Sequence, residues 1–250
     1  MNKFNVLAIT TALTLCASHA SANLVPIGVL PSTGNGLGTV FSSLTFQNTG
    51  AESGCISYSG VSTVTGSGAC PAGFTGGNET TVAGNNIFTT ADLGFSNTID
   101  FRNLVLIFNG NEGGGADASI TLNSLGLSLY SSTGTRLITF TAPALPINYA
   151  SLPGIGNAGY AFALDATEAA QANALLAGTT STTRLRLGTE ANVTGASAGP
   201  ETIQLATVTN TGVGGGGGSV TPEPGTMVML GSGLLFAGLY GRKRRSSSQS

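Results

Sequence analysis

Between residues 23 and 213 the sequence alternates apolar and polar side chains in short groups, which glycine and asparagine interrupt. Ile138 and Phe140 alternate with threonines, and Leu185 and Leu187 alternate with arginines. Period-two alternation buries one face of a strand, and glycine supplies the positive φ angles that tight turns need. With 38 glycines and 41% apolar residues, the chain is expected to be all-β and to bury a core.

Three local features refine this expectation. Residues 104–108 form a continuous apolar run, which predicts a central strand covered on both faces. The alternation slips phase at Asn123-Ser124, which predicts a bulge or a tight turn. Residues 165–178 are alanine-rich, begin with the capping residue Asp165 and end in glycine, so they predict a helix. This helix would connect strands at residues 160–164 and 183–187.

These elements favour a jelly-roll-like β-sandwich of about eight to ten strands, with one short connecting helix across one end. The length of 250 residues alone would also allow two small domains. A β-solenoid is the rival architecture, but the sequence has no fixed repeat period. We therefore expect a single sandwich.

The N-terminus has the pattern of an export signal. Lys3 gives a positive start, residues 6–16 are apolar, and Ala20-Ser21-Ala22 matches an A-x-A cleavage site. The alternative is a buried N-terminal helix, but the small-residue site directly after a short apolar run favours a signal peptide. We expect cleavage after residue 22.

Cleavage would remove Cys16 and His19, the only histidine of the chain. Cys55 and Cys70 would remain as the only cysteines of the mature protein. Exported proteins meet an oxidising environment, so this pair is expected to form a disulfide rather than a metal site or a redox motif.

The C-terminal region has three consecutive parts. Pro222-Glu223-Pro224 follows an uninterrupted glycine run at residues 214–218, which predicts a flexible linker. An apolar stretch at residues 226–240 comes next, close to the lower limit of ~17 residues for a membrane-spanning helix. The stretch ends at four basic residues, Arg242, Lys243, Arg244 and Arg245, which would hold this end in the cytoplasm. A buried C-terminal helix of a soluble domain is the alternative.

Taken together, the Pro-Glu-Pro motif, the apolar span and the basic stop resemble a PEP-CTERM sorting signal over residues 221–245. The chain differs at Thr221, where the family often has valine, and at Gly225, where serine or alanine is common. The resemblance implies a Gram-negative bacterium that produces extracellular polysaccharide. It also implies an exosortase, an integral-membrane cysteine transpeptidase-like enzyme, which would recognise this chain and cleave it at or near the motif.

The expected organisation has five parts. They are a signal peptide (1–22), a β-sandwich domain (23–210), a glycine-rich linker (211–220), a sorting signal (221–245) with the motif, a transmembrane helix and the basic stop, and a polar tail (246–250).

Charge and composition exclude several function classes. Between residues 23 and 220 four arginines stand against ten carboxylates, a formal charge of −6, so the domain would repel nucleic acid. The mature protein would have no histidine, and its lysine lies only near the end of the chain. Most nucleophile–base arrangements and zinc sites are therefore excluded. A glycosidase could still use two of the carboxylates as its catalytic pair. However, no two acids stand out by their spacing, and the chain has no tryptophan on which a sugar could stack. We expect no enzyme and no required cofactor.

One glycine-rich segment could bind calcium through its oxygen ligands. The candidate ligands are Asn109, Asn111, Glu112 and Asp117, but they lack the regular spacing of a calcium loop, so a polar hairpin loop is the simpler interpretation. Asp92 and Asp100 form a second acidic patch. Two Asn-x-Thr sequons, at Asn78 and Asn192, are expected to mark exposed loops.

The sequence therefore predicts an exported, non-enzymatic surface or matrix protein that an exosortase sorts and that is associated with exopolysaccharide or biofilm. A transient inner-membrane anchor would precede its release to the cell surface or extracellular matrix. The alternative is a carbohydrate- or calcium-binding module displayed at the cell surface.

Overall fold

A computed structural model describes residues 24–31, 37–80, 85–111, 119–148, 158–197 and 199–208. These residues form twelve strands, one α-helix and one 3-10 helix. The strands are β1 (Leu24–Pro31), β2 (Leu37–Phe46), β3 (Gly50–Tyr58), β4 (Thr63–Thr65), β5 (Phe88–Thr89), β6 (Leu104–Asn109), β7 (Ser119–Tyr130), β8 (Arg136–Ala142), β9 (Leu145–Asn148), β10 (Ala158–Leu164), β11 (Arg186–Ala196) and β12 (Glu201–Val208). The helices are η1 (Ser67–Ala69) and α2 (Ala166–Ala177).

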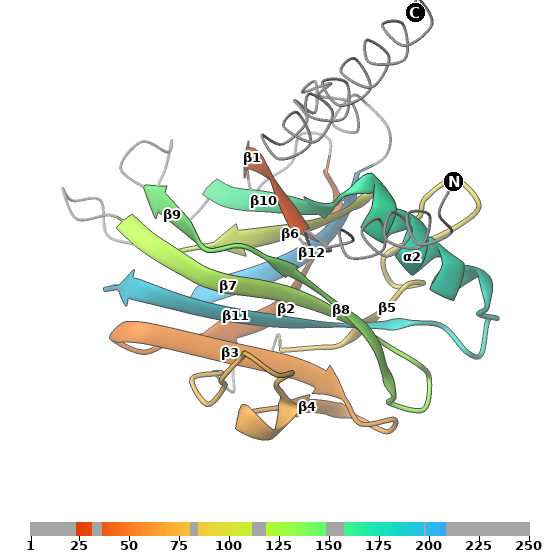
Figure 1. Cartoon of the computed structure of the whole chain (residues 1–250), viewed down its shortest axis with the longest axis horizontal. Helices are drawn as coiled ribbons and strands as arrows, with labels where there is room; N and C mark the ends of the chain where they lie inside the picture. Colours follow the sequence, from red (N-terminus) through yellow and green to blue (C-terminus); the bar gives the residue numbers. More distant parts are fainter. Residues whose placement is uncertain are drawn as a thin grey trace, which may run out of the picture. The chain divides into compact units, whose positions relative to one another are not determined.

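The strands form two antiparallel sheets that stack on each other (Figure 1). The five-stranded sheet has the order β1-β10-β6-β12-β2. The seven-stranded sheet has the order β4-β3-β11-β7-β8, with β5 paired to β11 and β9 paired to β7. The predicted all-β class with one connecting helix is confirmed, with more strands than expected because β4, β5 and β9 are very short. The finer jelly-roll-like assignment stays a prediction.

The main core fills the space between the sheets. Phe46, Phe108 and Phe162 from the five-stranded sheet meet Phe140 and Leu187 from the seven-stranded sheet there, all at most 1% exposed. Alternate side chains of an extended strand point to opposite faces, so each strand contributes every second residue. The burial pattern therefore agrees with the period-two alternation of the sequence.

Strand β6 confirms the predicted central strand. Leu104, Leu106 and Phe108 belong to the main core, while Val105 and Ile107 belong to a second, smaller buried cluster on the opposite face of the sheet. A strand buried on both faces needs apolar residues at consecutive positions. The continuous run at residues 104–108 meets that requirement.

Helix α2 connects β10 in one sheet to β11 in the other and lies at one end of the stack (Figure 1). Asp165 is its N-cap: the carboxylate Oδ1 accepts hydrogen bonds from the backbone N–H groups of Thr167 at 2.7 Å and Glu168 at 3.0 Å. These bonds satisfy donors that have no partner within the helix. The predicted helix, with Asp165 and Gly178 as its caps, is confirmed.

Strand β11 is longer than the sequence predicted. The alternation indicated a strand over residues 183–187, but β11 runs from Arg186 to Ala196 and is central to the seven-stranded sheet. Asn192 therefore lies in a strand and not in the exposed loop that its sequon suggested. Opposite it, the pairing with β7 jumps from Ser124 to Leu122, which confirms a bulge at Asn123.

The chain divides into two compact units, residues 1–211 and 212–250, and all described residues belong to the first. Several predicted segments lie outside the described residues. They are the signal peptide with Ala20 and Ala22, the glycine-rich linker, the motif Pro222, Glu223 and Pro224, the apolar span at 226–240 and the basic stop Arg242, Lys243, Arg244 and Arg245. Where residues are described, no helix is both long and apolar enough to cross a membrane.

Candidate functional site

An open pocket of about 620 Å³ lies where α2 ends. Its walls come from the loop at residues 90–100, the C-terminal half of α2, and residues 179–184, which lead into β11. Five of its lining residues carry hydroxyl groups, namely Thr90, Ser96, Thr179, Thr180 and Ser181. The side-chain amides of Asn97 and Asn173 and the apolar side chains of Phe95 and Leu176 add to the lining. A few polar groups beside apolar surface are typical of small-molecule sites.

Hydrogen bonds join the walls of this pocket. Thr90 N donates to the carbonyl of Leu185 at 3.0 Å, which ties the loop to the start of β11. Phe101 N donates to the Asn173 side chain at 3.0 Å, which ties the other end of the loop to α2. Phe95 packs edge-on against Phe101 with ring centroids 4.9 Å apart. The pocket is therefore built from segments that contact one another directly.

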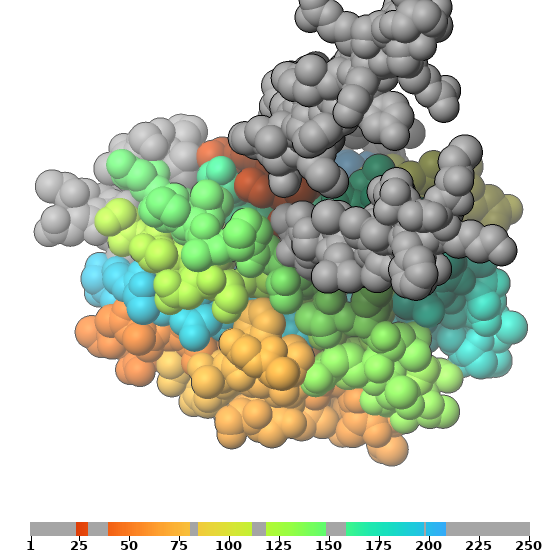
Figure 2. Space-filling model, viewed as in Figure 1, coloured from red at the N-terminus to blue at the C-terminus, as the bar shows by residue number. Residues whose placement is uncertain are grey.

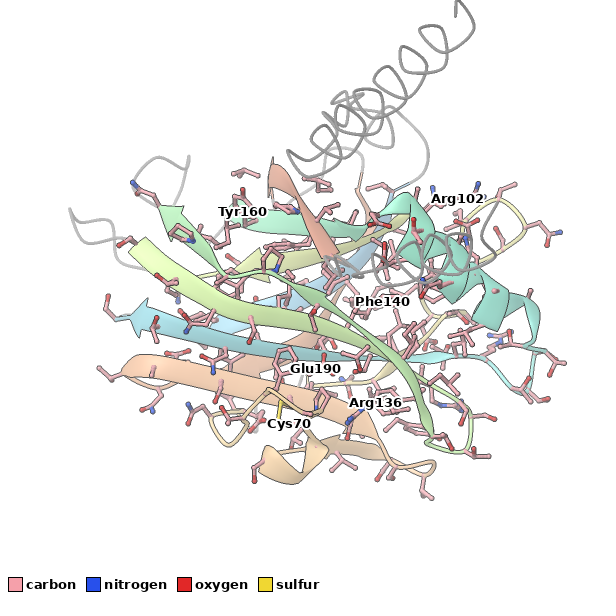
Figure 3. The ribbon with its side chains drawn as sticks, viewed as in Figure 1. Cys70, Arg102, Arg136, Phe140, Tyr160 and Glu190 are labelled. Carbon is pink, nitrogen blue, oxygen red and sulfur yellow. A yellow bond between two sulfur atoms is a disulfide. The ribbon has the colours of Figure 1, made fainter. Side chains whose placement is uncertain are left out.

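Two charged residues line the pocket, Asp100 and Arg184. Asp100 is paired with Arg102, whose Nε lies 3.0 Å from both carboxylate oxygens. Figure 3 shows Arg102 beside α2. This guanidinium is the main cause that lowers the pKa of Asp100, so the carboxylate stays ionised and its charge is balanced. Arg184 is exposed, and its guanidinium makes no ion pair with any residue that the structure describes.

A second unusual site lies on the outer face of the seven-stranded sheet. Glu190 of β11 is completely buried, and its Oε1 accepts a hydrogen bond from Ser128 Oγ at 2.5 Å. Its Oε2 has no hydrogen-bond partner among the described residues. Burial raises the pKa of Glu190 from 4.5 to about 8, against the lowering effects of Ser128 and Arg136. This carboxyl group is therefore largely protonated at neutral pH.

Residues 67–79, here called the covering segment, lie over this face (Figure 2, light orange). The segment contains Phe74, whose ring edge lies against Gly126; a Cβ at Gly126 would come within 2.9 Å of the ring and 2.6 Å of Glu190 Oε2. Gly126 pairs directly with Glu190 across the two strands. The missing side chain at Gly126 therefore leaves room for both the carboxyl group and the ring.

The covering segment is attached to the sheet both covalently and by hydrogen bonds. The predicted disulfide is present: Cys55 of β3 is bonded to Cys70, and Cys55 pairs with Glu190 in the sheet. Arg136 donates from Nε to the Tyr130 hydroxyl and from Nη2 to the Ala69 carbonyl, both at 3.0 Å. Figure 3 shows Cys70, Arg136 and Glu190 in this region. Glu190 is thus enclosed by a segment that is fixed both covalently and by hydrogen bonds.

No metal site follows from the cysteines among the described residues. The two sulfurs and a carboxylate oxygen of Glu79 lie within 4.8 Å of one another, but the sulfurs are bonded to each other and cannot act as thiolate ligands. Glu79 instead accepts a hydrogen bond from Cys55 N at 2.7 Å. It acts as a further anchor of the covering segment.

The candidate calcium ligands are only partly described. Asn109 is the last residue of β6. Asn111 lies two residues further along the chain, and its backbone carbonyl accepts a hydrogen bond from Gly199 N at 3.0 Å. Glu112 and Asp117 lie outside the described residues. In the second acidic patch, Asp92 accepts hydrogen bonds from Thr89, and Asp100 is paired with Arg102. The calcium site stays a prediction.

Sequence reasoning missed both the pocket and the buried carboxyl group. The pocket combines segments that are more than 70 residues apart in the chain, such as Asn97 and Asn173, and none carries a motif. The sequence offered one signal for the burial of Glu190. This residue lies in the short, weakly polar sequence Gly-Thr-Glu-Ala, directly after the strand expected at residues 183–187. Extending β11 through that sequence would have placed Glu190 on the face opposite Leu187.

The described part of the chain is thus a disulfide-linked, two-sheet β-domain with a polar pocket beside α2. The comparisons add what lies beyond it: residues 220–245 match the family model of the PEP-CTERM protein-sorting motif, so the chain carries this motif. The motif implies export, cell-surface sorting and processing by an exosortase, as the sequence predicted. No curated protein and no solved structure matches the chain.

Proposed function

We propose that this chain is a non-enzymatic protein of an exopolysaccharide-rich cell surface or extracellular matrix. It would be anchored briefly in the inner membrane by its C-terminal span and then released by an exosortase. The observation that carries this proposal is the sorting motif at residues 220–245, placed at the end of an exported β-domain.

The physical character of the C-terminus supports this order of events. Proline fixes φ and lacks a backbone donor, so Pro222 and Pro224 favour an extended segment that a processing enzyme can bind. The basic residues 242–245 favour the cytoplasmic side of the membrane, which leaves the β-domain outside. The glycine run at 214–218 would give the folded domain freedom to stand clear of the enzyme.

The described side chains support a non-enzymatic role. Cys55 and Cys70 are bonded to each other, so neither offers a thiolate nucleophile. Glu190 has a pKa suited to acid–base chemistry, but it is completely buried beneath the covering segment. A catalytic group must come within hydrogen-bond reach of a substrate, and this one is sealed from solvent.

Mass spectrometry of the C-terminus of the cell-surface form tests the sorting proposal. We expect the wild-type surface protein to end at or near Pro222-Glu223-Pro224 and to lack residues 242–245. The double variant Pro222→Ala/Pro224→Ala should stay in the membrane fraction with its basic end, whereas the control Ser247→Ala in the polar tail should be processed normally. Recovery of the wild-type chain from the cytosol with both ends intact would refute the proposal.

A second candidate function is carbohydrate binding by the displayed domain. The observation that favours it is the pocket beside α2, where hydroxyl, amide and charged groups surround the apolar side chains of Phe95 and Leu176. Sugars present hydroxyl groups on their edges and C–H groups on their ring faces, so a site of this mixed character fits them.

A further inference from the structure

The charge of the pocket differs from that of the domain as a whole. Residues 23–220 carry a formal charge of −6, yet inside the pocket the charge of Asp100 is balanced by Arg102. That pairing leaves Arg184 as the uncompensated charge of the lining. The pocket therefore carries a net positive charge, from Arg184, on a domain that is acidic as a whole, and this charge favours the binding of an anionic group.

Among the described arginines, Arg184 is the one whose guanidinium has no partner within the described part of the chain. Arg102 binds Asp100, and Arg136 binds the Tyr130 hydroxyl and the Ala69 carbonyl. Arg186 lies over the Tyr58 ring at 4.5 Å and donates to the backbone of Arg184. Five N–H donors in a planar fork are thus available at the pocket edge, and this geometry matches a carboxylate bidentately.

The rest of the lining fits the neutral parts of a sugar. Asn97, Thr180 and Ser181 are exposed at the pocket edge and offer donors and acceptors to hydroxyl groups. Phe95 and Leu176 are half-buried and offer apolar surface to the C–H face of a ring. Because the pocket is open, a sugar within a longer polymer could enter without a free chain end.

We propose that this pocket binds a carboxylate-bearing sugar unit of a polysaccharide, with Arg184 binding the carboxylate and the hydroxyl and amide side chains binding the ring hydroxyls. The inference rests on the proposed role at a polysaccharide-rich surface and adds the class of sugar and the residue that selects it. In this site Arg102 neutralises the charge of the Asp100 carboxylate, which would otherwise repel the carboxylate of the ligand.

Calorimetric titration of the exported protein, purified from cells as they process it, tests the inference. The probes are the trisaccharides of galacturonate, glucuronate and mannuronate, each with its carboxyl-reduced neutral counterpart, at fixed ionic strength. We expect saturable binding of at least one acidic trisaccharide, at least tenfold tighter than its neutral counterpart. If none of the three acidic trisaccharides binds saturably, or if each one that binds is matched by its neutral counterpart, the inference is overturned.

Two matched arginine variants locate the site. Arg184→Gln should weaken binding at least tenfold, whereas Arg186→Gln, with the same loss of charge two residues away, should leave the affinity within twofold. Equal weakening by both would indicate long-range attraction without a site and would overturn the inference. Ala177→Trp, at an exposed position of the pocket lining, should block binding. If that variant does not fold, the arginine pair still decides.

The outcome is separable from that of the sorting experiment. Titration measures the binding of sugars by the exported protein, whereas mass spectrometry determines where its C-terminus has been cut. A processed protein that binds no acidic sugar contradicts only the pocket inference, and an unprocessed protein that binds one contradicts only the sorting proposal.

Discussion

A single residue, Glu190, makes the stability of the domain depend on pH. Its pKa is about 8 in the folded protein against 4.5 as its ordinary value, so the folded state holds a proton that the unfolded state releases between these values. Stability is therefore greatest below pH 4.5 as far as Glu190 is concerned, falls as the pH rises, and levels off above about pH 8. The slope from one such group is at most about 1.4 kcal/mol per pH unit.

Glu190→Gln should remove this pH dependence, because glutamine is neutral and has nearly the shape of the protonated acid. Denaturant unfolding at pH 5, 6, 7, 8 and 9 measures it: the wild-type free energy of unfolding should fall from pH 5 to 8, and that of the variant should change less. The difference between the two proteins should be largest at pH 8 to 9. Parallel profiles for the two proteins would show that Glu190 is not the group responsible.

At the scale of elements, the covering segment depends on its covalent attachment. The disulfide joins Cys55 to Cys70 across 15 residues, and by the loop-entropy model a bridge of this length stabilises by roughly 3 kcal/mol. The double variant Cys55→Ser/Cys70→Ser should lose about that amount in denaturant unfolding. Arg136 and Glu79 still hold the segment, so the variant should fold.

The same change should expose the buried carboxyl group more often. Amide hydrogen exchange in residues 67–79 and around Glu190 should accelerate in the double variant, while exchange in β6 should follow global unfolding only. An exported wild-type protein with free thiols before reduction would contradict the bridge itself. Unchanged exchange in residues 67–79 would show that the hydrogen bonds alone hold the segment.

The sequence predicted well those elements that are specified by residues close together in the chain. The cap at Asp165 and the alanine-rich run specify α2, and the continuous apolar run specifies β6. β11 was underestimated because Gly188, Thr189 and Glu190 break the alternation, and pairing with β3 and β7 on both sides makes them a strand. The burial of Glu190 and the shape of the pocket depend on contacts between distant segments, which no local pattern records.

For the whole molecule, the structure indicates that the β-domain should be stable without the two ends of the chain. The main core lies between strands from Leu24 to Leu205, and the disulfide and α2 both lie within that part. The sorting motif at 220–245 and the expected signal peptide at 1–22 lie outside it. Processing at both ends would therefore leave every core residue that the structure describes in the released protein.

This separation predicts how a chain of residues 23–211, without leader and tail, will unfold. It should unfold in one cooperative transition, because its core is intact, with a Tm within about 3 °C of the tail-bearing chain, which corresponds to roughly 1 kcal/mol for a domain of this size. Differential scanning calorimetry of both chains under oxidising conditions measures this. A larger drop, or a broad transition in the short chain, would mean that residues 212–250 contribute to the folded core and that exosortase cleavage weakens the protein it releases.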